Sequence, residues 1–181
     1  MPFLHKRLLF LGLCSCILII GLFYQASNHP SKEAVQAVVD SNAALPGSAA
    51  PDAEVTGLND QSYQLRSFFG KPVLLTFFTT WCEICQEEIP ALSNYYEKNS
   101  DQLRVIAVNA TSQETSIQDV KNFASQGQLK MPVLLDDSGE AMDAYQITGV
   151  PISYLIDEDG AVVRTFYGKI DPQEIDGLLD Q

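Results

Sequence analysis

The sequence predicts an α/β domain in which helices flank a central mixed β-sheet. First, apolar runs rich in β-branched and aromatic residues occur at 73–78, 103–109 and 152–157, and such runs are typical of buried strands. Second, segments between these runs space their apolar residues at helical intervals. Third, about 130 residues follow position 50, which is enough for one domain with its own core.

The first half of this domain is predicted to form a hairpin, a buried strand and a helix. A polar Asn59-Asp60 pair separates two short alternating segments, and this pattern is typical of a hairpin turn. In chain order, the predicted elements are hairpin strands at 53–56 and 62–65, a helical turn at 67–70, a strand at 73–78 and a helix over 86–92.

The second half alternates in the same way. The predicted elements are a strand at 103–109, a helix at 117–124, an extended segment at 132–136, a short helix at 140–145, strands at 152–157 and 161–167, and a helix at 172–179. Asp159-Gly160 predicts a tight turn between the last two strands, and Pro172 suits the first turn of a helix. This order predicts a thioredoxin-like α/β fold with an N-terminal hairpin and a central insertion.

The N-terminus predicts a membrane anchor. Lys6 and Arg7 precede an apolar run at 8–24, about 17 residues long, which is at the short end for a bilayer-spanning helix. No convincing small-x-small cleavage site follows the run, so we favour an uncleaved anchor over a cleaved signal peptide or a lipoprotein leader. The positive-inside rule keeps the basic end in the cytoplasm and exports the rest.

Composition then divides the chain into three parts. Residues 26–50 are small and polar and contain prolines, as in a tether between a membrane and a domain. We therefore expect a cytoplasmic tail with a membrane anchor (or signal peptide) at 1–25, a linker at 26–50 and the thioredoxin-like domain at 51–181. The catalytic domain of such a single-pass protein would lie on the extracytoplasmic side of the cell membrane.

Charge and residue usage narrow the classes of partner and cofactor. The net charge is −12, with 23 acidic and 11 basic residues. A nucleic-acid partner would require a basic face, so we expect none. The chain has four Cys and two His, and beyond His29 the soft metal ligands are Cys82, Cys85 and a few Met. We therefore expect no bound metal, haem or other cofactor.

Cys82 and Cys85 lie where the strand at 73–78 gives way to a helix. Two thiols at i and i+3 on the first turn of a helix are close enough to form a disulfide. The positive end of the helix dipole favours a thiolate, which is the nucleophile of thiol–disulfide exchange. The alternatives are a structural disulfide or half of a zinc site, and zinc would need further ligands that the folded part lacks.

From about residue 51 to 179, the chain resembles the membrane-anchored, extracytoplasmic thioredoxin-like proteins of the ResA/TlpA type. The matching stretches are 70–75, 80–85 with the following Glu88 and Pro90, 105–109, 132–136 and 149–157. The resemblance implies that Cys82 is the exposed attacking thiol and Cys85 the buried resolving thiol. Two positions depart from common patterns. Ile84 stands where many members carry proline, and Thr76 where cytoplasmic thioredoxins carry a buried acid.

Spacing and resemblance together assign the remaining site residues. Glu88 lies one helical turn after Cys85, so we expect a buried carboxyl with a raised pKa that exchanges a proton with the resolving thiol. The resemblance implies that Pro151 is a cis-proline facing the disulfide, which lets the Val150 backbone pair with an extended substrate. Trp81 is expected to shield the site and contact the substrate. A solvated Glu88, a trans Pro151 and a purely structural Trp81 are the alternatives.

The leading hypothesis is an exported protein-disulfide reductase that receives electrons from a membrane thiol donor. The resemblance implies clients such as apocytochrome c during cytochrome c maturation. Negative charge near the sulfurs opposes thiolate formation, which favours a reductant over an oxidant. A peroxiredoxin-like peroxidase is one alternative, suggested by Thr79 three residues before Cys82. A non-catalytic metallochaperone or binding module that uses the thiols as ligands is the other.

Overall fold

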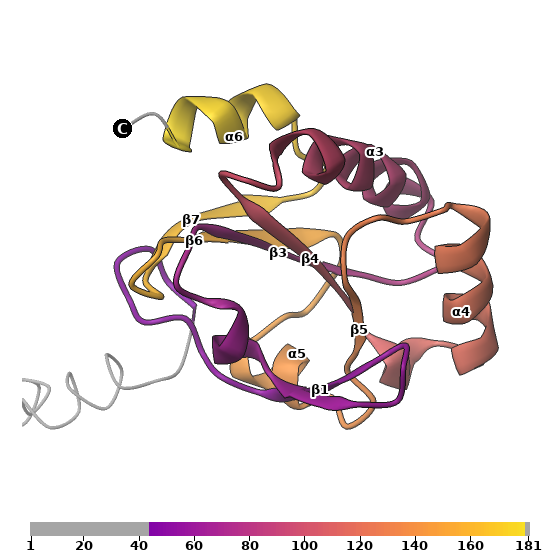
Figure 1. The fold of residues 1–181 in the computed structure, drawn as a ribbon. Helices are drawn as coiled ribbons and strands as arrows, with labels where there is room; N and C mark the ends of the chain where they lie inside the picture. Colours follow the sequence, from indigo (N-terminus) through magenta and orange to yellow (C-terminus); the bar gives the residue numbers. More distant parts are fainter. Residues whose placement is uncertain (1–43, 180–181) are drawn as a thin grey trace, which may run out of the picture. The chain divides into compact units, whose positions relative to one another are not determined.

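The structure, a computed structural model, describes residues 44–179. The predicted anchor and most of the predicted linker lie outside the described residues. Figure 1 shows the elements, which are β1 (Glu54–Gly57), β2 (Ser62–Gln64), η1 (Leu65–Phe68), β3 (Val73–Phe78), α3 (Glu83–Asn99), β4 (Arg104–Asn109), η2 (Thr111–Gln113), α4 (Ile117–Gln126), β5 (Val133–Leu135), α5 (Glu140–Ala144), β6 (Ile152–Ile156), β7 (Val162–Tyr167) and α6 (Pro172–Leu179). None of the helices within residues 44–179 is long and apolar enough to cross a bilayer.

The described strands form one seven-stranded sheet in the order β2-β1-β5-β4-β3-β6-β7. The central strand β3 pairs in parallel with β4 and antiparallel with β6, so the sheet is mixed. At one side, the β1–β2 hairpin joins the sheet through antiparallel pairing of β1 with β5. The predicted thioredoxin-like α/β fold with its N-terminal hairpin is confirmed.

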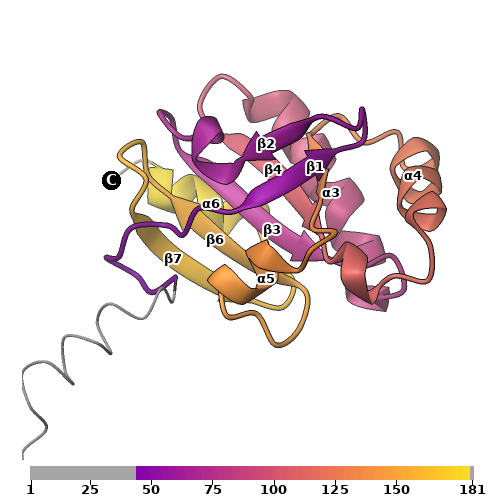
Figure 2. The ribbon, with the colours of Figure 1, turned by 90° about the horizontal axis from the view of Figure 1, so that it is seen from below.

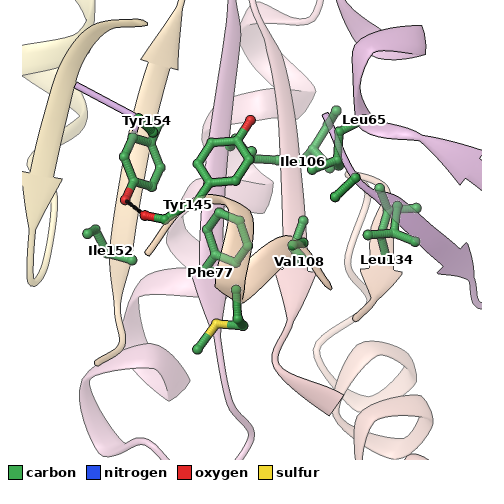
Figure 3. Packing of buried hydrophobic residues seen from close by; sticks show 14 of the residues in the cluster. Leu65, Phe77, Ile106, Val108, Leu134, Tyr145, Ile152 and Tyr154 are labelled. Carbon is green, nitrogen blue, oxygen red and sulfur yellow. Dashed lines mark hydrogen bonds between the residues drawn. The ribbon is translucent and has the colours of Figure 1, made fainter. Parts of the chain in front are cut away.

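Helices cover both faces of the sheet (Figures 1 and 2). The helices α3, α4 and α6 contribute to one apolar cluster, and α5 contributes to the other. All six residues of β3 are buried, and the five apolar ones alternate between the two clusters, as a strand with two covered faces requires. Figure 3 shows one cluster, in which Phe77 of β3 packs against Tyr145 and Tyr154. Full burial of a side chain such as Phe77 contributes about 1.5–3 kcal/mol.

Thr76 is the one polar residue of β3, and it is fully buried. Its hydroxyl accepts a hydrogen bond of 2.8 Å from the hydroxyl of Ser153 on the neighbouring strand β6. The pair satisfies two polar side chains inside an otherwise apolar layer, which avoids the cost of burying unpaired hydroxyls. At the position where cytoplasmic thioredoxins carry an acid, this protein therefore has a neutral hydrogen-bonded pair.

Several predicted boundaries differ from the structure; the helix expected over 86–92, for example, is α3, which spans Glu83–Asn99. The helical turn expected at 67–70 is η1, which begins earlier, at Leu65, directly after the hairpin strand ends at Gln64. The domain boundary expected at residue 51 is also too late. Val162 of β7 donates to the Ser48 carbonyl (2.8 Å) and accepts from the Gly47 N–H (2.7 Å), so this end of the predicted linker belongs to the domain.

Small residues explain the misplaced boundary. Ala49 forms an isolated antiparallel bridge with Ala161, and Ala44 is 6% exposed within an apolar cluster. Side chains of this size let one backbone approach another closely and add little apolar pattern to the sequence. A run of small residues with prolines therefore resembles a linker in composition even where it pairs with a strand.

Candidate active site

The two candidate thiols lie at the junction of β3 and α3. The strand ends at Phe78, a short loop follows, and Cys82 is the N-cap of α3, where its sulfur accepts a 3.2 Å hydrogen bond from the Cys85 N–H. The sulfurs of Cys82 and Cys85 are joined as a disulfide, with a Cα–Cα distance of 5.2 Å. In the reduced protein, this N-cap position would stabilise a Cys82 thiolate through the backbone donor and the helix dipole.

The two sulfurs differ in access. Cys85 is 0% exposed and lies inside the cluster formed under α3, whereas Cys82 is 9% exposed at the edge of that cluster. Trp81 and Ile84, near Cys82, are 59% and 49% exposed, so exposed apolar side chains flank the accessible sulfur. An incoming molecule can therefore reach Cys82 but not Cys85, and it would meet apolar side chains as it does so.

The loop before β6 lies against Cys82. The Val150–Pro151 peptide bond is cis, as the resemblance implies, and β6 begins at the next residue. The Val150 carbonyl oxygen lies 3.9 Å from Cys82 Sγ. The Pro151 carbonyl accepts a 3.0 Å hydrogen bond from the Gly168 N–H, which ties this loop to the end of β7. A fixed backbone segment is thus held beside the accessible sulfur.

Glu88 is buried, as predicted, with 1% of its surface exposed. Its Oε1 accepts a 2.7 Å hydrogen bond from the Ile170 N–H, and its Oε2 has no partner among the described residues. Burial raises the pKa of this carboxyl, and the hydrogen bond from Ile170 partly opposes the shift. One turn of α3 separates it from Cys85, so a carboxyl that favours its protonated form lies on the buried side of the site.

Glu87 has the opposite environment. Its carboxylate is exposed and pairs with Lys169 at 2.8 Å, and the hydrogen bond from Lys169 lowers the pKa of Glu87. The pair places a solvated acid on the outer face of α3. Adjacent residues of one helix thus hold a buried and an exposed carboxyl.

Sequence reasoning missed the residue that holds the active-site loop, which is Glu114. Its Oε1 accepts hydrogen bonds from the Thr80 N–H (2.6 Å) and from Asn109 Nδ2 (2.7 Å), and its Oε2 accepts from the Thr80 hydroxyl (2.7 Å). The neighbouring Gln113 carbonyl accepts a 3.1 Å hydrogen bond from the Trp81 indole N–H. The segment after β4 therefore fixes the two residues that precede Cys82.

A further contact closes this loop from the helix side. Gln86 Nε2 donates to the Thr80 carbonyl at 2.7 Å, so Thr80 is held through its N–H, its hydroxyl and its carbonyl. No sequence signal pointed to Glu114, because it follows η2 in a polar segment without periodicity. The feature that could have identified Glu114 is its place shortly after the end of β4. That strand neighbours β3, which leads into the Cys82–Cys85 motif.

One sulfur can meet an incoming disulfide, and its partner lies behind it, placed to displace the product. The fold and the site together define a thioredoxin-like thiol–disulfide oxidoreductase. Among residues 44–179, no group of three or more His, Cys, Asp or Glu side chains is placed to hold a metal ion.

Comparison with known proteins gives the family. A sequence profile of the AhpC/TSA family matches residues 46–165, and the chain belongs to this family. The thiol-disulfide oxidoreductase ResA of Bacillus cereus is 37% identical over 134 residues, which cover 74% of this chain and 76% of the relative. The thioredoxin-like protein YneN of Bacillus subtilis is 36% identical over 134 residues, covering 74% of this chain and 78% of the relative.

Solved structures agree with this placement. StoA from Bacillus subtilis matches with a TM-score of 0.64 and 26% identity, over 75% of this chain and 100% of StoA. A putative thiol:disulfide interchange protein DsbE from Chlorobium tepidum matches with a TM-score of 0.65 and 27% identity, over 75% of this chain and 94% of that chain. The protein is therefore a thiol–disulfide oxidoreductase of the ResA/DsbE type.

Proposed function

We propose that this protein is an exported reductant that opens disulfides in client proteins. The observation that carries the proposal is the difference in access between the two sulfurs, because a reductase needs one thiol to attack and a second to release the client. The buried Glu88 supports thiol–disulfide exchange at this site, since a carboxyl that favours its neutral form can donate or accept a proton beside the resolving thiol.

The reaction balances within the site and the client. The Cys82 thiolate attacks one client sulfur, forms a mixed disulfide and releases the other client sulfur as a thiolate. The Cys85 thiolate then attacks Cys82 Sγ, which forms the Cys82–Cys85 disulfide and releases the second client sulfur. Two electrons pass to the client, its sulfurs are protonated, and Glu88 is placed to exchange a proton with Cys85. A membrane thiol donor would reduce the Cys82–Cys85 disulfide again.

The charge around the sulfurs supports a reductant. Oxidants of this class hold a strongly stabilised thiolate, with potentials near about −120 mV, against about −270 mV for thioredoxin. Lys169 neutralises Glu87, which leaves Glu88 as the buried acid next to the site. When it is ionised, a carboxyl there works against thiolate formation at Cys85, whereas the helix dipole favours a thiolate at Cys82 by up to about 1 kcal/mol.

The proposed location and client rest on the sequence. The apolar run at 8–24 would anchor the protein, and the domain would lie on the extracytoplasmic side of the membrane. The resemblance to the ResA/TlpA type supports apocytochrome c as a client, whose paired thiols would be kept reduced for haem attachment. One Bacillus subtilis relative, 32% identical over 107 residues, is named a sporulation thiol-disulfide oxidoreductase, so reduction of a client in sporulation, or of an envelope protein, is a variant of the same function.

Single-cysteine variants test the proposed order of attack. Cys82→Ser should abolish insulin reduction, whereas Cys85→Ser should accumulate stable mixed disulfides, because a bound client leaves through attack by Cys85. Non-reducing electrophoresis of each variant after incubation with an oxidised client measures the trapped species. Equal trapping by both variants would overturn the order. Peroxide consumption and Cu(I) binding, measured on the same preparations, separate this function from a peroxidase and from a metallochaperone.

A further inference from the structure

A hollow with a volume of about 410 Å³ adjoins the loop that covers Cys82. Its lining includes Leu45, Tyr145, Thr148, Val150, Tyr154 and Tyr167, and none of its lining residues is charged. Figure 3 shows Tyr145 and Tyr154 side by side, with ring centroids 5.0 Å apart. Pockets for small molecules span about 300–1,000 Å³, so this volume, near the low end of that range, has room for one large side chain.

Val150 connects the hollow to the redox site. Its carbonyl oxygen lies 3.9 Å from Cys82 Sγ, and its residue also lines the hollow. Val150 packs against both apolar clusters, which lie on opposite faces of the sheet. Cys82 belongs to the cluster under α3, whereas Tyr145 and Tyr154 belong to the other cluster. The redox sulfur and the hollow therefore lie on opposite sides of one short backbone segment.

This arrangement fixes which client residue can enter the hollow. An extended client segment that pairs with the Val150 backbone has side chains that alternate between its two sides. When the client cysteine faces Cys82, the residue next to it in the client sequence faces the opposite side. That side is the one on which the hollow lies.

We infer that the hollow receives an uncharged aromatic side chain directly next to the client cysteine. Tyrosine rings and aliphatic groups form much of the lining, beside the polar side chains of Gln146 and Thr148, and aromatic pairs add about 0.5–1.5 kcal/mol beyond the burial of their area. Tyr167 is 83% exposed at the rim, so an entering ring covers an aromatic surface that is otherwise open to water. A charged side chain would lose hydration without meeting an opposite charge in the lining.

The inference rests on the proposed reduction of client disulfides, and a matched peptide series tests it. Each extended peptide would lack tryptophan and carry one cysteine joined to glutathione as a disulfide. The residues on either side of that cysteine would be Phe, Ala or Glu. The second-order rate constant for attack by the reduced protein is measured for each peptide. We expect the constant to be about 10-fold higher for a Phe peptide than for its Ala counterpart, and lowest for Glu.

Two variants and one control locate the source of the preference. Gly149→Leu should reduce the Phe/Ala ratio toward 1, because Gly149 lines the hollow and a Cβ there meets no atom within 4 Å, so the added side chain occupies open space. Tyr167→Ser removes an exposed wall and should also lower the ratio. Gly177→Leu adds the same side chain on α6, where a Cβ also meets no atom within 4 Å, and it should keep the wild-type ratio.

The ratio cancels any general loss of activity in a variant. A wild-type ratio near 1, or a high ratio that survives both Gly149→Leu and Tyr167→Ser, overturns the inference about the hollow. Insulin reduction by the same wild-type preparation shows that the reductase function stands in that case. Failure of the wild-type protein to reduce insulin and every peptide would instead remove the reductase function, and the inference with it.

Discussion

Replacing Glu114 by alanine should destabilise the domain by about 2–4 kcal/mol. The carboxylate accepts three hydrogen bonds, two from Thr80 and one from Asn109. Hydrogen bonds to a charged group contribute about 1.5–3 kcal/mol each, so the three set an upper limit of about 4.5–9 kcal/mol. Two features lower this figure. The contacts are only partly buried, and Asn109 Nδ2 keeps a 3.3 Å hydrogen bond to the Phe78 carbonyl.

Glu114→Gln provides a graded comparison. Its amide oxygen can accept from the Thr80 and Asn109 nitrogens as Oε1 does, and its amide nitrogen can donate to the Thr80 hydroxyl, which also accepts hydrogen bonds. Loss of the charge alone should cost about 1 kcal/mol. Glu97→Ala removes the same charge from an exposed position of α3 and should change the stability by less than about 0.5 kcal/mol.

Urea denaturation of the oxidised proteins, followed by far-ultraviolet circular dichroism, measures these differences. The denaturation midpoint should fall while the dependence on urea stays constant, because the unfolded chain exposes the same surface. A Glu114→Ala protein as stable as Glu97→Ala would show that the hydrogen bonds to Thr80 and Asn109 do not stabilise the loop. An equal loss in the Ala and Gln variants would show that charge, rather than hydrogen-bond geometry, is responsible.

Two further predictions concern the proton and the membrane. Glu88→Gln should lower reductase turnover by about 10-fold to 1,000-fold and simplify the pH profile of Cys82 alkylation. Glu87→Gln should change neither property, since its carboxylate is exposed. Comparable effects from both variants would mean that a long-range electrostatic field, rather than a local proton transfer, sets the chemistry. Because burial raises the pKa of Glu88 above 4.5, its contribution to stability is complete below that pH and is lost as the pH rises through the raised value. Melting temperatures measured over this pH range should therefore fall with rising pH in the wild type, and Glu88→Gln should remove that dependence. The full-length protein should fractionate with membranes and resist carbonate extraction through residues 8–24, and recovery of a soluble mature protein that starts near Ser27 would show instead that the leader is cleaved.

The regular elements could be predicted because their patterns are local. The buried run at 73–78 forms β3 with the same bounds, and the Asp159-Gly160 turn is present with Gly160 at φ +84°. Glu88 could be placed because a spacing of three residues on a helix determines its face. In each case, a few consecutive residues carry the information.

Contacts between distant segments could not be predicted in the same way. Glu114 reaches Thr80 across 34 positions of sequence, and neither segment has a periodic pattern that reports the pairing. The hollow beside Val150 needs Leu45, Tyr145 and Tyr167 together, which depends on how β7, the loop before β6 and the start of the domain pack. Such sites arise from the topology of the sheet, and single-sequence patterns do not specify them.

The late completion of the active site has a consequence during protein synthesis. Cys82 and the Val150 carbonyl that covers it are separated by 68 positions. At a synthesis rate of about 5–20 residues per second, the ribosome adds this stretch in about 3–14 s. Throughout that interval, the growing chain carries both cysteines without the loop that restricts access to Cys82. Until the residues around Val150 fold against Cys82, the newly made chain therefore presents both thiols without this cover.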